Sequence, residues 1–296
     1  MQKTLDLSIK YAETGTLDGA YAFNEKASYP SYMTQNDWDA FVEEMKVSYN
    51  QAYKELIAGS GGELKPQGHR PPKMASYGSS SRLIYRLSKS FMPQFHLEHK
   101  LSTYIGGIAN IDGFMETDTS LYFIEAKCRE PYGAKSKLIK SAYRKLYKYI
   151  NDDPSCNLNI HLVETDKDNM IVTFSVGETI ISTFDIKQMI CHLLGIAMNV
   201  MNAPTQKAIK FLYLCYNPKL IEIIAPGKKN KIIATYDKMC SECRLIDFNA
   251  LFKTIVSFLS VEISKETRTD LISQNYDFDF CFTLCDQSNY TDLLNN

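Results

Sequence analysis

Three charged residues occupy an otherwise apolar part of the chain, at spacings that suit phosphate chemistry. Asp112 lies in one predicted strand, and Glu125 and Lys127 lie two residues apart in the next. Side chains alternate between the faces of a strand, so Glu125 and Lys127 share a face with Leu121 and Phe123. A half-buried strand normally keeps its charged and apolar residues on opposite faces. This conflict between pattern and charge indicates a functional site.

The two carboxylates suit a hard divalent cation. If the two strands pair through the turn at 117–119, a register with Asp112 beside Glu125 is reached, with a bulge needed to fix it. Two carboxylates in a partly apolar site repel each other, and Mg²⁺ relieves this repulsion while it shares phosphate oxygens with a substrate. Mn²⁺ is expected to substitute for Mg²⁺. Lys127 is placed to orient an attacking water or to offset charge on the phosphate.

The segments Ile111-Asp112-Gly113 and Phe123-Ile124-Glu125-Ala126-Lys127 resemble the signature of the PD-(D/E)xK nuclease superfamily. The resemblance is specific over about residues 81–128 and extends more loosely, through the order of helices and strands, to Pro218. It implies a restriction-endonuclease-like fold. It also implies that Asp112 and Glu125 hold the catalytic Mg²⁺, that the backbone carbonyl of Ala126 completes the site, and that Lys127 assists the water.

The chain departs from the superfamily pattern at two places besides Ile111, which stands where the signature has proline. Many members carry another acid on the helix before the first strand, but residues 81–90 contain none. The nearest acid is Glu98, which we expect either as a third ligand or as a partner behind the ligands. Gln188 and His192 lie four apart on the helix predicted at 185–201. Some members carry a glutamine with an aromatic residue at this spacing, but here the second residue is His192 and not a tyrosine, so the match is partial. Gln188 is a further candidate, and the alternative that we favour is a core helix with one satisfied histidine.

A cluster of basic residues follows the predicted catalytic strand. It contains Lys135, Lys137, Lys140, Arg144, Lys145 and Lys148, with Tyr143 and Tyr147 between them. We expect these residues on a helix at 135–150 whose basic face contacts the phosphate backbone of DNA. The alternative is a solvated helix face with long lysine side chains that cover apolar surface.

Periodicity, glycines and prolines predict an α/β protein. The expected helices are 37–58, 81–90, 135–150, 185–201 and 248–259, the expected strands are 95–104, 109–116, 121–128, 158–163, 170–176 and 208–216, and a hairpin or loop is expected around Gly227. With the resemblance, the fold is a restriction-endonuclease-like mixed β-sheet core flanked by helices, with an N-terminal helical extension. The boundaries are a helical extension at 1–62, a linker or loop at 63–80, a nuclease-like core at 81–218 and a C-terminal extension packed on the core at 219–296.

The cysteines offer a second candidate metal site. Cys240 and Cys243 form a CxxC pair, and Cys281 and Cys285 form a CxxxC pair. Four thiolates could bind Zn²⁺ or an iron–sulfur cluster. However, Cys281 and Cys285 lie in an apolar strand-like run, where cysteine behaves as a small hydrophobic residue. We therefore favour a structural role for all four.

Composition limits the remaining classes of function. The chain has 296 residues, 45% of them hydrophobic, eight cysteines and a formal net charge of −1, which is typical of a globular protein with reduced thiols. The stretch 189–201 falls short of the roughly 20 apolar residues that span a bilayer. We expect a cytoplasmic protein without a membrane partner. A homodimer is an open alternative.

These observations predict a Mg²⁺-dependent nuclease, most simply an endonuclease, that hydrolyses DNA. RNA hydrolysis uses the same chemistry and is not separated from it by sequence. The alternative is a nucleic-acid-binding or assembly subunit of the same fold that has lost full metal coordination. The absence of an acid at 81–90 favours this alternative.

Overall fold

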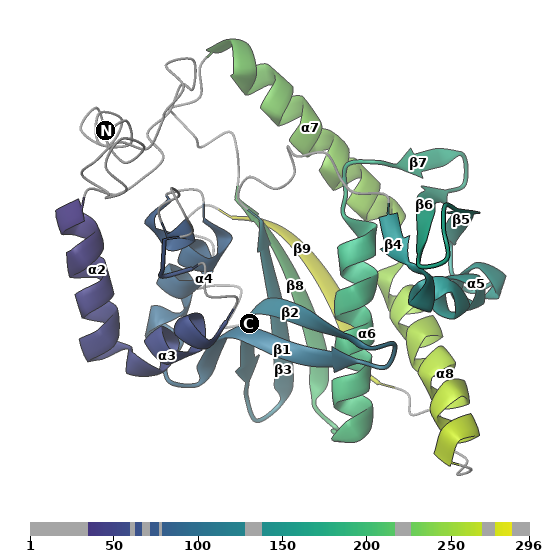
Figure 1. Cartoon of the computed structure of the whole chain (residues 1–296), viewed down its shortest axis with the longest axis horizontal. Coiled ribbons are helices and arrows are strands. Elements are labelled where there is room, and N and C mark those ends of the chain that lie inside the picture. Colours follow the sequence, from purple (N-terminus) through teal and green to yellow (C-terminus); the bar gives the residue numbers. More distant parts are fainter. Residues whose placement is uncertain are drawn as a thin grey trace.

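A mixed sheet of five strands runs through the middle of the molecule, within the residues that the computed structural model describes (Figure 1). These residues are 35–59, 63–66, 72–76, 79–127, 138–216, 226–267 and 276–285. The strands are, in order across the sheet, β1 (Phe95–Thr103), β2 (Gly107–Glu116), β3 (Ser120–Lys127), β8 (Ala208–Tyr216) and β9 (Phe278–Cys285). β1, β2 and β3 pair antiparallel, whereas β8 and β9 are parallel to β3. The expected α/β fold, with a mixed sheet core and flanking helices, is confirmed.

Helices α2 (Gln35–Ser48), α3 (Asn50–Ala58) and α4 (Ser80–Ser88) contribute to the apolar cluster on one face of the sheet. The single helix expected at 37–58 is divided at Tyr49, whose ψ of 48° departs from helical geometry. The linker expected at 63–80 is also corrected for its described part. Leu64, Met74 and Ala75 are buried in the same cluster, so this stretch packs against the core.

Helices α6 (Ile186–Asn202), α7 (Pro226–Leu245) and α8 (Phe248–Thr267) contribute to the apolar cluster on the other face. A hairpin or loop around Gly227 was the expectation, but this segment begins α7. Proline suits the first position of a helix, because its missing N–H has no intrahelical partner there. Helix α8 continues eight residues beyond the expected end at Leu259.

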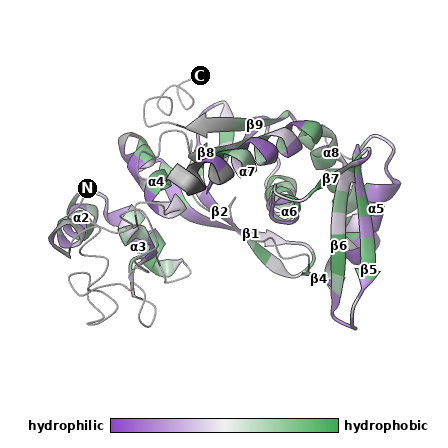
Figure 2. Cartoon of the chain, turned by 90° about the horizontal axis from the view of Figure 1, so that it is seen from above, coloured by the Kyte–Doolittle hydropathy of each residue, from purple (hydrophilic) through white to green (hydrophobic). Residues whose placement is uncertain are grey.

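A second, smaller sheet lies at the far side of α6 and α8 (Figure 2). It contains β4 (Leu138–Lys140), β5 (Leu158–Glu164), β6 (Asn169–Val176) and the short β7 (Thr179–Ile181), and it packs with α5 (Arg144–Asp152). The helix expected at 135–150 is therefore wrong over its first described residues. The backbone of 138–140 pairs with β6, which buries Ile139, and tertiary pairing overrides the local helical pattern.

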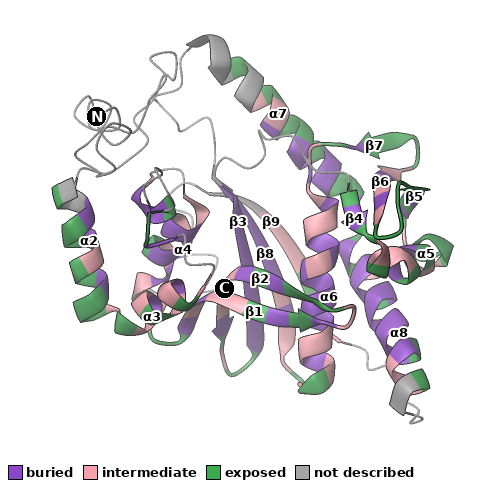
Figure 3. Ribbon diagram, in the orientation of Figure 1, coloured by how far each residue is buried: buried purple, intermediate pink, exposed green. Residues whose placement is uncertain are grey.

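Strand β3 is buried along its whole length because both faces of the sheet are covered (Figure 3). β8, predicted as a strand buried on both faces, lies beside it and is buried from Phe211 to Cys215. The C-terminal extension is part of this core, since β9 continues the main sheet next to β8. Any charged side chain on β3 is consequently held inside the protein.

Candidate active site

Glu125 and Lys127 lie on the face of β3 that their alternation predicts. Leu121 and Phe123 on the same face belong to the apolar cluster beneath α6. Glu125 is 2% exposed and Lys127 is 6% exposed, which is rare for charged residues unless they are paired. They are paired here, because Lys127 Nζ donates to Glu125 Oε1 at 2.5 Å.

Gln188 contacts the same carboxylate from α6. Its Nε2 donates to Glu125 Oε1 at 2.9 Å, while its backbone N–H is capped by Asp185 Oδ1 at 3.1 Å. This cap fixes the first turn of α6 and so places the Gln188 side chain over β3. The structure thus brings the glutamine predicted from its spacing into contact with the predicted acid.

Asp112 reaches β3 from the neighbouring strand. The β2–β3 pairing ends at Gly113 opposite Ile124, and beyond it the Ala126 N–H donates to Asp112 Oδ2 at 2.8 Å. The Asp112 carboxylate thus accepts the hydrogen bond that a backbone carbonyl of β2 would accept in a regular sheet. Burial raises the pKa of Asp112 well above its usual range, and the nearby Glu125 carboxylate raises it further.

The irregularity predicted near Asp112 is a change of face in β1 and β2. Ala109 and Ile111 lie in the cluster beneath α6, whereas a Cβ on Gly113 would meet Phe95 in the cluster beside α4. In a regular strand, residues 109, 111 and 113 would all lie on one face. Here Gly113 lies on the other face, so the strand must rotate at Asp112. This rotation directs the Asp112 carboxylate to the edge of β3.

Glu98 lies opposite Asp112 in β1, between the pairs Leu97–Gly113 and His99–Ile111. It adopts a φ of 50°, which is unusual for a residue other than glycine and marks the same change of face. Its Oε1 accepts a 3.3 Å hydrogen bond from Ser81 Oγ on α4. Burial raises the pKa of Glu98, with Glu63 as the next cause. Its carboxylate therefore contacts α4, and its role as a third ligand stays a prediction.

His192 is a site residue that the sequence interpretation favoured as a core histidine. It is 3% exposed, and its Nδ1 lies 3.7 Å from Glu125 Oε2. Neither of these two buried atoms has a hydrogen-bond partner among the described residues. Burial lowers the pKa of His192, and the negative charge of Glu125 opposes this effect. His192 lies four residues after Gln188, and this spacing places both side chains on the same face of α6.

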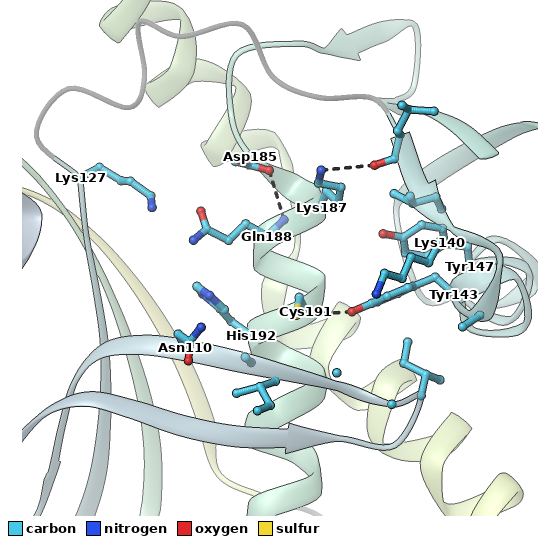
Figure 4. A pocket seen from close by; sticks show the side chains of 18 residues that line it. Asn110, Lys127, Lys140, Tyr143, Tyr147, Asp185, Lys187, Gln188, Cys191 and His192 are labelled. Atoms are coloured by element: carbon cyan, nitrogen blue, oxygen red, sulfur yellow. Dashed lines mark hydrogen bonds between the residues drawn. The ribbon is translucent and has the colours of Figure 1, made fainter. Parts of the chain in front are cut away.

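A cavity of about 730 Å³ opens beside these residues (Figure 4). Lys127, Gln188 and His192 point toward one another at one end of it. Lys140 and Tyr143 lie at the other end, across α6. The tip of the β1–β2 hairpin, residues 105–110, forms a further wall. The cavity runs from the small sheet to Lys127, whereas Asp112 and Glu125 are not among its lining residues.

The donor chemistry of the charged cluster fits a hard divalent cation. Asp112 and Glu125 offer carboxylate oxygens from adjacent strands, and Glu125 Oε2 is buried without a hydrogen-bond donor in the described part of the chain. Such an oxygen costs free energy that a bound cation would remove. The same described residues contain no group of three or more His, Cys, Asp or Glu side chains that could hold a metal ion. A metal ion at Asp112 and Glu125 would need backbone oxygen and water to complete its ligands.

The predicted basic helix face is divided in the structure. Lys135 and Lys137 lie outside the described residues, and Lys140 belongs to β4 at the cavity. Arg144 pairs with Glu164 at 2.9 Å and Lys145 pairs with Glu262 at 3.2 Å, both on α5. Lys148 is exposed on the same helix. Only Lys140 of the described members lines the cavity.

The cysteines on α7 are buried, and burial raises the pKa of the Cys243 thiol, which opposes thiolate formation. Cys281 lies on β9, and the Cys285 side chain is outside the described part. Glu242 lies between the two α7 cysteines, and the CxxC motif gives no indication of its role. Its carboxylate accepts hydrogen bonds from the backbone N–H groups of Thr183 and Phe184, both at 2.7 Å.

Comparison with known proteins gives no relative. No family model matches the chain, and neither a curated protein nor a solved structure is significantly similar to it. In the part of the chain that the structure describes, each helix is too short or too polar to cross a membrane.

Proposed function

We propose that the protein is a Mg²⁺-dependent nuclease of restriction-endonuclease-like fold that hydrolyses phosphodiester bonds of DNA. The observation that carries this proposal is the buried cluster of Asp112, Glu125 and Lys127 on two adjacent strands, with one Glu125 oxygen that has no hydrogen bond from any described residue. A structural ion pair needs no second carboxylate, and a second carboxylate raises the cost of burial. A bound cation would offset the free energy that the burial of both carboxylates costs.

Asp112, Glu125 and the Ala126 carbonyl would hold the metal ion. When bound, Mg²⁺ would neutralise phosphate oxygens and lower the pKa of a coordinated water. Lys127 lines the cavity, and its ammonium group can orient the attacking water and offset negative charge on the phosphate. Gln188 keeps Glu125 in place through its hydrogen bond. Hydrolysis forms one bond from water oxygen to phosphorus and breaks one P–O bond, leaving a phosphate monoester and a hydroxyl group.

Cleavage of supercoiled plasmid and linear duplex with Mg²⁺ or Mn²⁺ tests the proposal. We expect Asp112→Asn to lower the rate by about 100-fold or more, because it removes a charged ligand. Asp118→Asn, in the turn between β2 and β3, is the matched control and should cut like wild type. Calorimetry should detect Mg²⁺ binding to wild type and not to Asp112→Asn. Cleavage by Asp112→Asn at the wild-type rate would overturn the proposal.

A second candidate is a nucleic-acid-binding subunit with an inactive site. The direct Lys127–Glu125 pair favours it, since this ion pair neutralises Glu125 without a metal. DNA binding by wild type, without cleavage and without Mg²⁺ binding, would support this candidate over the nuclease.

A further inference from the structure

The cavity beside the charged cluster combines exposed apolar side chains with cations. Ile108, at the tip of the β1–β2 hairpin, is 60% exposed, and Leu138, on β4, is 51% exposed. Both line the cavity. Large apolar side chains held in water at a cavity rim indicate a surface that binds an apolar partner group.

The charged residues that line the same cavity are mainly cationic. Lys127, Lys140 and Lys187 contribute ammonium groups, and Asp185 is the one acidic residue among the lining residues of the described chain. Asp185 caps α6, and Lys127 pairs with Glu125. Lys187 donates to the Leu138 carbonyl at 3.3 Å. The net positive charge suits phosphate groups. The apolar rim suits the faces of bases, which are accessible only when the bases are unstacked.

Tyr143 adds an aromatic surface to the wall that carries Lys140. Its ring is half-buried, and its hydroxyl group donates to Cys191 Sγ on α6 at 3.4 Å. Its ring also lies against Tyr147, with 5.8 Å between the ring centroids. The ring is thus held in one orientation at the cavity wall, as a platform for base stacking requires.

We propose that this cavity binds the unpaired end of a DNA strand and delivers it to the cluster on β3. The bases would contact Ile108, Leu138 and Tyr143, and the backbone phosphates would lie along Lys140 and Lys187 toward Lys127. This inference rests on the proposed nuclease function and specifies its substrate as single-stranded DNA or a duplex with a single-stranded overhang.

The size of the cavity excludes a duplex from this position. Pockets of about 300–1,000 Å³ hold one drug-sized molecule, and the present cavity of about 730 Å³ falls in this range. It therefore accommodates one or two nucleotides. In a duplex the base faces are stacked inside and phosphates line the outside, so the apolar rim would have no partner.

Binding assays test the inference independently of catalysis. Fluorescence anisotropy with a labelled DNA oligonucleotide, in EDTA, compares the single strand with its blunt duplex. We expect the wild-type protein to bind the single strand about tenfold more tightly, as the stacking of one base predicts. Leu138→Ser and Ile108→Ser should each remove most of this preference. Ile180→Ser, an equally exposed position on β7 outside the cavity, is the matched control and should retain it.

Cleavage assays with Mg²⁺ separate this inference from the proposed function. Cleavage of single strands and overhangs about tenfold faster than blunt duplex supports both. Cutting of blunt duplex or closed plasmid at the same rate as single strands supports the nuclease and overturns the single-strand inference. Without cleavage of any substrate, the nuclease proposal fails, and a single-strand preference that depends on Leu138 still supports the binding role of the cavity. Equal binding of single strand and duplex overturns the inference that the cavity binds unpaired DNA.

Discussion

Replacing Glu242 by glutamine is expected to destabilise the protein and to loosen the start of α6. The carboxylate is 2% exposed and accepts four hydrogen bonds. Oε1 accepts from the backbone N–H and hydroxyl group of Ser182, both at 3.1 Å. Oε2 accepts from the backbone N–H groups of Thr183 and Phe184 at 2.7 Å. These three residues directly precede Asp185, which caps the helix.

The magnitude follows from the number of donors that glutamine leaves unpaired. Glutamine keeps one oxygen, which can serve two of the four donors, and turns an NH₂ group toward the other two. Each buried donor left without an acceptor costs about 1–3 kcal/mol. Two such donors predict a loss of about 2–6 kcal/mol. Ser182 is exposed, so its two donors can turn to water when the glutamine oxygen faces the N–H groups of Thr183 and Phe184. The expected loss therefore lies at the lower end, about 2–3 kcal/mol.

Urea unfolding followed by circular dichroism measures this loss. With an m value of about 3 kcal/mol per molar urea, the midpoint should fall by about 1 M. Glu178→Gln makes the same chemical change at an exposed position and should stay within about 0.5 kcal/mol of wild type. If the midpoint of Glu242→Gln also stays within about 0.2 M of wild type, the reasoning from unpaired donors is refuted.

Three further substitutions test the packing and the charges of the site. Gly195→Ala would place a Cβ 2.9 Å from the Cβ atoms of both Ala109 and Leu101, so α6 must move outward. Thermal unfolding should show a net loss of stability of about 1–2 kcal/mol. An increase in stability would contradict this close packing. Gly113→Ala would place a Cβ 2.5 Å from Phe95 Cζ and should cost about 1–3 kcal/mol in urea unfolding, whereas unchanged stability would show that the ring can move freely. The raised pKa of Asp112 means that the folded protein holds this proton more tightly than the unfolded chain, so deprotonation at high pH costs stability. In EDTA, Asp112→Asn should therefore raise the free energy of unfolding at alkaline pH, and the gain should shrink as the pH falls; a gain independent of pH would contradict the assignment.

The central strands and the charged pair on β3 could be predicted because they depend on local alternation. Two-residue periodicity places Glu125 and Lys127 on one face whatever packs above them. The change of face at Asp112 was predicted only as a bulge of unknown position. Its structural form depends on Glu98, whose positive φ leaves no trace in the residue types.

Tertiary contacts decide the elements that were predicted wrongly. Residues 138–150 have apolar side chains at helical spacing, but the first three pair with β6, which is distant in the sequence. A hairpin or loop is expected around Gly227, but Pro226 occupies the first position of a helix and α7 begins there. The sequence of the Cys240–Cys243 motif gives no sign of the role of Glu242. That role depends on hydrogen bonds from the backbone N–H groups of a distant segment.

The topology of the main sheet has a consequence for the order of folding. β1, β2 and β3 are joined by short hairpins and can pair as soon as they are synthesised. The other edge of β3 must wait for β8, since Ser120 pairs with Ala208 across the intervening small sheet and α6. Such distant parallel pairing is slow, because the closure of a long loop precedes the contacts that stabilise it. Gln188 also follows β3 late in the chain, so the charged pair on β3 is completed only after most of the protein has folded.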